Sequence, residues 1–187
     1  MIVFLDFEAS SLSDDSYPIE VAWAAEDGST EQHLIRPAPA WTDWSPAAER
    51  VHGINRDTLL AEGEPHDEVA RRTFETLSPH EVFVTAPSWD GKWMSVLLRS
   101  AGLPRHALRL KDADEAHLRA AEMGIGSALP DGEATAAALW LIAEARRQAL
   151  SGPPAHRALA DAEAELSLWR EVGRLAARFA CERRTVD

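Results

Sequence analysis

Apolar runs and alternating segments divide the first half of the chain into strands. The run from Ile2 to Phe7 is short and rich in aliphatic and aromatic residues, which is typical of a strand buried on both faces. Two further strand-like segments are joined by the sequence EDGS, which favours a hairpin turn. Three antiparallel strands are therefore expected first, and two later apolar runs predict two more. The five predicted strands span residues 2–7, 19–25, 30–37, 81–86 and 106–112.

Helical periodicity accounts for most of the remaining sequence. Glycine and proline mark several boundaries, such as Gly53 and the SGPP segment at 151–154. The predicted helices span residues 46–53, 66–77, 88–100, 113–121, 133–150 and 155–180. Strands followed by strands that alternate with helices predict a single α/β domain over residues 1–187, with a mixed five-stranded sheet flanked by helices. The tryptophans expected in its core are Trp23, Trp140 and Trp169.

Composition narrows the functional classes. A single cysteine excludes an internal disulfide framework and a multi-cysteine zinc site, and it fits a reducing compartment. No apolar run approaches the roughly 20 residues that span a bilayer, and Asp6 and Glu8 interrupt the N-terminal apolar run, which does not resemble a signal peptide. We therefore expect a cytoplasmic protein without a membrane partner. The net charge of −12 argues against tight non-specific binding of duplex nucleic acid but leaves single-stranded or frayed ends open.

Acidic residues stand at three places where chemistry is expected. Asp6 and Glu8 are two apart on a strand, so they share one face and lie about 7 Å apart. Asp90 follows the fourth strand at the start of a helix, and Asp161 lies on the inward side of the last helix, five residues after His156. Each has an ordinary explanation, as solvated acids at a strand end, a helix cap, or a surface histidine. Their joint occurrence in this order is more specific.

This arrangement resembles the DEDDh 3′-to-5′ exonucleases, which include proofreading exonuclease subunits and RNase T-like enzymes and have an RNase H-like fold. The matching segments are FLDFEASSL, YPIEVAW, VHGI, SWDGKWMSVLL and HRALADAEAEL. The resemblance implies that the metal-binding carboxylates are Asp6, Glu8, Asp90 and Asp161. It also implies that His156 is the general base, and a histidine can accept a proton near neutral pH.

The chemistry of four carboxylates agrees with that assignment. Converging acids without a counter-charge repel one another and resist ionisation. Two divalent cations relieve this repulsion, and oxygen ligands suit Mg²⁺ or Mn²⁺ better than zinc. Such a pair of ions can activate water and stabilise the departing 3′ oxygen of a phosphodiester. The expected reaction releases 5′-mononucleotides from the 3′ ends of single-stranded or frayed DNA or RNA.

The resemblance also implies a set of substrate contacts. The turn after Glu8 would contact the terminal nucleotide, and Leu12 would wedge against its base. His52 lies near the nucleotide in the resembling enzymes. The expected contacts are Ala9, Ser10, Ser11, Leu12, His52 and Trp89. Other polar residues have simpler expectations, because Glu20 should make a structural contact and Lys92 could steer a phosphate.

Two alternatives remain open at this point. One is a metal-dependent phosphoesterase that acts on nucleotides or short oligomers, which the acidic composition favours. The other is a non-catalytic nucleic-acid-binding module on the same fold, which would be expected to lack an acid or His156. The resemblance allows a homodimer or a partner that delivers substrate, but no segment of the sequence identifies an interface.

Overall fold

A computed structural model describes residues 1–149 and 156–184 of the chain. The chain forms two compact units, which are considered separately. The sheet unit comprises residues 1–111 and 156–163, and the helical unit comprises residues 112–149 and 164–184. Helix α7 (Ala158–Arg184) begins in the sheet unit and continues into the helical unit.

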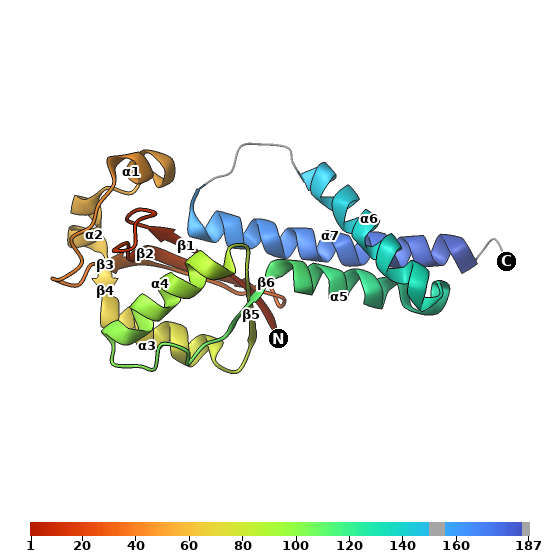
Figure 1. Ribbon diagram of the computed structural model, residues 1–187, viewed down its shortest axis with the longest axis horizontal. Helices are drawn as coiled ribbons and strands as arrows, with labels where there is room; N and C mark the ends of the chain where they lie inside the picture. The colour runs from red at the N-terminus through yellow and green to blue at the C-terminus, as the bar shows by residue number, and fades with distance from the viewer. Residues whose placement is uncertain (150–155, 185–187) are drawn as a thin grey trace. The chain divides into compact units, whose positions relative to one another are not determined.

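The sheet unit contains a mixed sheet of six strands in the order β4-β3-β2-β1-β5-β6 (Figure 1). The first three strands form an antiparallel meander, and β5 pairs parallel to β1 at the centre. The strands are β1 (Ile2–Ala9), β2 (Pro18–Ala25), β3 (Thr30–Arg36), β4 (Glu64–Pro65), β5 (Glu81–Val84) and β6 (Leu110–Asp112). The predicted fold class, a mixed sheet flanked by helices, is confirmed.

One face of the sheet bears the hydrophobic core. Leu5 and Phe7 of β1 project there beside Trp23 of β2, because residues two apart on a strand share a face. The helices α3 (His66–Leu77) and α4 (Pro87–Ser100) cover this face, and α4 contributes the buried Trp93 and Leu97. This packing fixes the position of α4, whose first turn contains Asp90.

The opposite face of β1 presents Phe4, Asp6 and Glu8. The register pairs Asp6 with Ala22 and Glu8 with Glu20, so small and acidic side chains occupy this part of β2. The first turns of α7 belong to this unit, their Ala158 and Ala162 are buried, and the backbone N–H of Ala158 donates to Glu20 of β2. The local sequence therefore brings a polar helix terminus against a strand that presents two acids.

One short helix and a sixth strand were not predicted. Strand β4 has only two residues and includes Pro65, so it lacks the alternation that identifies a strand. Helix α2 (Arg56–Glu62) is too short to show periodicity and depends on its Asn55 cap, which accepts the N–H of Thr58. The neighbouring α1 (Pro46–His52) ends as predicted at Gly53, which has a left-handed conformation with φ 71°.

The helical unit consists of α5 (Ala113–Ile125), a short 3₁₀ turn η1 (Gly126–Ala128), α6 (Asp131–Ala149) and the rest of α7. Its core includes Leu141 and Ile142 of α6. The prediction that Trp140 is a core residue is wrong, because its side chain is 60% exposed. Trp140 precedes the buried pair Leu141 and Ile142 and falls on the outer face of the helix.

Two other tryptophans were predicted to lie in the core. Trp23 of β2 is buried as expected, and Trp169 of α7 is half-buried. The SGPP break falls outside the described residues. None of the helices in the described part is both long and apolar enough to cross a membrane.

Candidate active site

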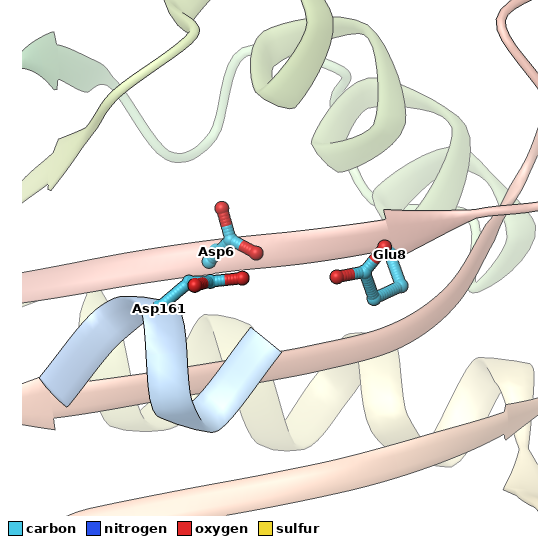
Figure 2. Close-up of side chains that lie close together, drawn as sticks. All are labelled: Asp6, Glu8 and Asp161. Atoms are coloured by element: carbon cyan, nitrogen blue, oxygen red, sulfur yellow. The ribbon is translucent and has the colours of Figure 1, made fainter. Parts of the chain in front are cut away.

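Two acids of β1 and one acid of α7 lie close together beside β1. Each of Asp6, Glu8 and Asp161 offers one carboxylate oxygen, and these oxygens all lie within 4.8 Å of one another. Figure 2 shows Asp6 and Glu8 projecting from β1 and Asp161 reaching them from the start of α7. The position of Asp6 and Glu8 two residues apart on β1 explains the first pair, and the hydrogen bonds between Glu20 and the start of α7 explain the third.

Burial and mutual repulsion make these acids reluctant to ionise. Burial, together with the charges of Asp90, Glu8 and Asp161, raises the pKa of Asp6 to about 9. Burial also raises the pKa of Glu8 to about 7, with Asp161 as the largest neighbouring charge. The pKa of Asp161 is raised by burial as well. Without a cation, the cluster therefore retains protons at neutral pH.

Asp90, in the first turn of α4, acts on the cluster through its charge. Its side chain is only 2% exposed, and Oδ2 accepts the backbone N–H of Ala86 at 3.1 Å. Burial raises the pKa of Asp90 to about 7 despite that hydrogen bond. Among neighbouring charges, that of Asp90 raises the pKa of Asp6 most. Asp90 thus faces the same cluster, although it is not one of the three residues whose oxygens lie within 4.8 Å.

Glu20 holds the start of α7 against the sheet. Its buried carboxylate accepts the backbone N–H of Ala158 at 3.0 Å and two N–H groups of Arg157, at 2.6 and 3.2 Å. Gln32 donates a further hydrogen bond to Oε1 at 2.6 Å. These donors lower the pKa of Glu20 although burial opposes them. The expected structural contact of Glu20 is therefore present, and it fixes the turn of α7 that contains Asp161.

His156 lies just before α7 and is exposed. Its backbone has a φ of 48°, which is uncommon for a residue other than glycine. A protonated His156 would lower the pKa of Asp161, so the imidazole is close enough to act electrostatically on the acidic cluster. Its position at the edge leaves the imidazole open to solvent.

A pocket of about 360 Å³ opens beside Glu8. It brings together four of the six expected substrate contacts, namely Ala9, Ser11, Leu12 and His52. The lining is largely apolar, with Ala47, Ala48 and Val51 contributed by α1. Leu12 is 71% exposed, which makes it available to a ligand.

One ring nitrogen of His52 is hydrogen-bonded within the described chain and the other is not. Its Nδ1 accepts the backbone N–H of Ile54 at 3.0 Å, so Nε2 carries the ring proton. Nε2 is buried and has no hydrogen-bond partner among the described residues. Burial lowers the pKa of His52, which keeps the ring neutral and Nε2 a donor.

The other two expected substrate contacts do not line this pocket. Ser10 is buried, where its hydroxyl donates to Asp43 and accepts the N–H of Tyr17, so it stabilises the turn. Trp89 stacks on Trp93, with the Nζ atom of Lys92 5.0 Å from its ring centroid.

Two further residues, one charged and one aromatic, do not line this pocket. Lys92 donates to the Ser13 carbonyl and the Ser16 hydroxyl, at 2.5 and 2.9 Å, so its ammonium is held by the turn. The loop residue Trp41 stacks on Tyr17, with ring centroids 5.3 Å apart.

Similarity at the level of sequence is absent. No protein-family model matches the chain, and no curated protein sequence matches it. Solved structures do match. The zinc-bound complex of E. coli exonuclease I with single-stranded DNA aligns with a TM-score of 0.66 and 17% identity, over 92% of this chain and 40% of that one. Its complex with a dT13 oligonucleotide aligns with a TM-score of 0.67 and 16% identity, over 95% and 42%.

The chain shares the fold of exonuclease I. The apo form of that enzyme gives the same result, with a TM-score of 0.62 and 16% identity over 95% of this chain. The chain spans about two fifths of the length of these structures. The likeness therefore supports the predicted fold, although no protein-family model matches the chain.

Some residues of the site had no signal in the sequence. Asp43 lies in a loop, yet it accepts the hydroxyl of Ser11 at 2.5 Å and so shapes the turn after Glu8. Arg157 binds Glu20 across most of the chain length. The apolar face of α1 could have been predicted from the sequence, because Ala47 and Val51 are four residues apart and share a helix face.

Proposed function

We propose that this protein is a metal-dependent 3′-to-5′ exonuclease that releases 5′-mononucleotides from single-stranded DNA or RNA. The observation that supports this most is the convergence of Asp6, Glu8 and Asp161 on a fold shared with exonuclease I. Buried Asp90, whose charge acts on Asp6, would be the fourth carboxylate of the site. The pocket beside Glu8 provides a place for a terminal nucleotide.

The acids are suited to divalent cations. All their donor atoms are carboxylate oxygens, which Mg²⁺ and Mn²⁺ prefer. The raised pKa values of Asp6, Glu8 and Asp90 reflect crowded, buried acids, which a cation would relieve. When bound, two divalent cations would polarise the scissile phosphodiester and acidify the attacking water.

The protein's own groups then have separate roles. Asp6, Glu8, Asp90 and Asp161 hold the cations, and Glu20 keeps Asp161 in place through the start of α7. His156 accepts the proton of the attacking water, a task that its exposed position beside Asp161 permits. In the pocket, Leu12 packs on the terminal base and the Nε2–H group of His52 donates to the nucleotide.

The first test is cleavage of labelled polymers. Single-stranded DNA and RNA oligomers with a 5′ label are incubated with the protein in Mg²⁺, in Mn²⁺ or in EDTA. We expect a ladder that shortens from the 3′ end only with metal, and the ratio of the two rates gives the sugar preference. Asp6→Asn should lower the rate by at least about 10³-fold, because a metal ligand is lost while the side-chain shape is kept.

A matched variant controls for general effects on the acidic surface. Asp14→Asn removes an exposed acid from the turn after β1 and should cleave at the unchanged rate. Failure to shorten either polymer, with metal binding shown by calorimetry, would contradict the proposal. Cleavage of p-nitrophenyl esters of nucleotides without cleavage of oligomers would favour a phosphoesterase of small substrates instead.

A further inference from the structure

A second cavity, of about 540 Å³, lies beside α4 and is basic. The loop between α4 and β6 lines it with Arg105, His106 and Arg109. Its other wall is the first half of α4, including Ser88 and Gly91. None of the described residues that line it is acidic. The chain has a net charge of −12, but the basic residues of this cavity would attract a negatively charged ligand.

Among the described residues, the two arginines of this cavity have no carboxylate partner. Several other arginines form ion pairs, as Arg72 does with Glu31 and Arg157 with Glu20. By contrast, no ion pair joins Arg105 or Arg109 to an acid within residues 1–149 and 156–184. Both side chains are exposed and therefore free to turn toward a ligand.

Arg105 has one contact, and that contact orients the neighbouring histidine. Its Nε donates to Nε2 of His106 at 2.7 Å, so Nε2 is an acceptor and the Nδ1 atom of His106 carries the ring proton. The terminal nitrogens of Arg105 remain available as donors. A planar guanidinium fork matches two oxygens of a phosphate group, which makes arginine the preferred residue for such anions.

The wall formed by α4 adds donors of the same sign. The first turn of a helix leaves backbone N–H groups without intrahelical acceptors, and the helix dipole is positive there. Ser88 supplies one such N–H group and a hydroxyl. At Gly91, a Cβ atom would meet no other atom within 4 Å, so the backbone is open toward a ligand. The adjacent residue in the sequence is Asp90 of the candidate active site.

We propose that Arg105, His106, Arg109 and the first turn of α4 bind a backbone phosphodiester of the single-stranded substrate, upstream of its 3′ end. The inference rests on the proposed function for the identity of the polymer, and on the cavity itself for the phosphate. The pocket beside Glu8 takes the terminal nucleotide, and this second cavity holds the strand on the other side of Asp90. It therefore gives the acidic protein a local means of retaining a polyanion.

The test measures binding without cleavage. Anisotropy of 5′-labelled oligothymidylates of two to about ten nucleotides is recorded in EDTA over a range of salt concentrations. Arg105→Ala/Arg109→Ala should bind the longest oligomer about tenfold more weakly at low salt. The slope of log affinity against log salt should fall by about 1 to 2, since up to two charged phosphate contacts are lost. Arg109→Glu should weaken binding further through repulsion.

The matched control is Arg36→Ala/Arg71→Ala, which removes the same charge from exposed positions away from the cavity and should leave affinity and slope unchanged. Equal affinity and slope for the unchanged protein and Arg105→Ala/Arg109→Ala would overturn the inference, as would the absence of any binding by the unchanged protein. An equal loss for thymidine 5′-monophosphate would also overturn it, because the cavity would then take a free monophosphate. The cleavage assay judges the proposed function separately, since these measurements need no turnover.

Discussion

Asp6 shows how a buried acid is tolerated only under particular conditions. Its pKa of about 9 means that the metal-free protein holds this carboxyl protonated at neutral pH. The same residue must lose its proton to bind a cation. Ionisation of Asp6 therefore destabilises the metal-free folded protein, whereas the ionised carboxylate stabilises the protein when a cation is bound.

The stability of the metal-free protein should consequently fall as the pH rises. Between about pH 4 and pH 9, Asp6 is ionised in the unfolded chain and protonated in the folded one, so folding takes up a proton and the free energy of unfolding decreases. Glu8 and Asp90 add to this slope up to about pH 7. Denaturant unfolding in EDTA measures the effect, and Asp6→Asn should reduce the slope and stabilise the protein at pH 9. A slope that Asp6→Asn leaves unchanged would show that other groups cause it.

At this scale the sequence predicted part of the site. The period of a strand is sufficient to place Asp6 and Glu8 side by side. The arrival of Asp161 required the resemblance, because no local pattern says which strand the last helix packs against. The partners of the turn after Glu8 could not be predicted, since Asp43 acts from a loop with no regular geometry.

Among the elements, the start of α7 depends on one buried acid of β2. Glu20 joins the first residues of this helix to the sheet, so the element that contributes Asp161 is fixed by a charge network and by its apolar side. Removing one partner of a buried ion pair leaves the other without compensation. Here the uncompensated group would be the guanidinium of Arg157, whose side chain is 45% exposed, so water would reduce the cost.

We expect Glu20→Gln to lower the free energy of unfolding by about 1–3 kcal/mol and to weaken metal binding, because the turn that holds Asp161 loses its main anchor. Chemical denaturation measures the first quantity, and calorimetric titration with Mn²⁺ measures the second. Asp57→Asn, an exposed acid in the first turn of α2, serves as the control and should change neither by much. Metal affinity that survives Glu20→Gln unchanged would mean that apolar packing alone positions Asp161.

The elements that the sequence predicted well are those with strong periodicity or clear boundaries. Helix α3 was predicted with the observed bounds, and α4 begins one residue earlier than predicted, at Pro87. The error at Trp140 arose because a large apolar residue in an apolar helical segment was assigned to the core. The correct assignment requires knowing which face of the helix each residue occupies. Two-residue strands such as β4 depend on tertiary pairing, which no local pattern records.

For the molecule as a whole, the proposed cation binding by the acidic cluster would link stability to divalent cations. A cation that binds only the folded protein stabilises it by about 2.7 kcal/mol at a hundredfold excess over its dissociation constant. Because binding releases protons from Asp6, Glu8 and Asp90, the affinity should increase with pH.

The rise in the thermal unfolding midpoint caused by Mn²⁺ or Mg²⁺ should therefore be larger at pH 8 than at pH 6. Differential scanning calorimetry at the two pH values provides the comparison. The effect should largely disappear in Asp6→Asn/Glu8→Gln, which retains the shape of the cluster without its charges. An equal rise at both pH values, or one that persists in that variant, would place the cation elsewhere on this acidic protein.

The sequence predicted the architecture of the sheet more completely than the division of the chain. The antiparallel arrangement of the first three strands follows from the hairpin signal and the apolar runs, and it is confirmed. The division into two compact units has no signal in composition, because α7 continues from one unit into the other without a break in its periodicity.

The site combines the first strand of the chain with its last helix, and this order matters during synthesis. On the ribosome, β1 emerges before α7, so a nascent chain has Asp6 and Glu8 long before Asp161 and His156 can join them. Until then, the ligand set for the cations is incomplete. The growing polypeptide is thus expected to remain inactive until α7 has emerged and folded against β1.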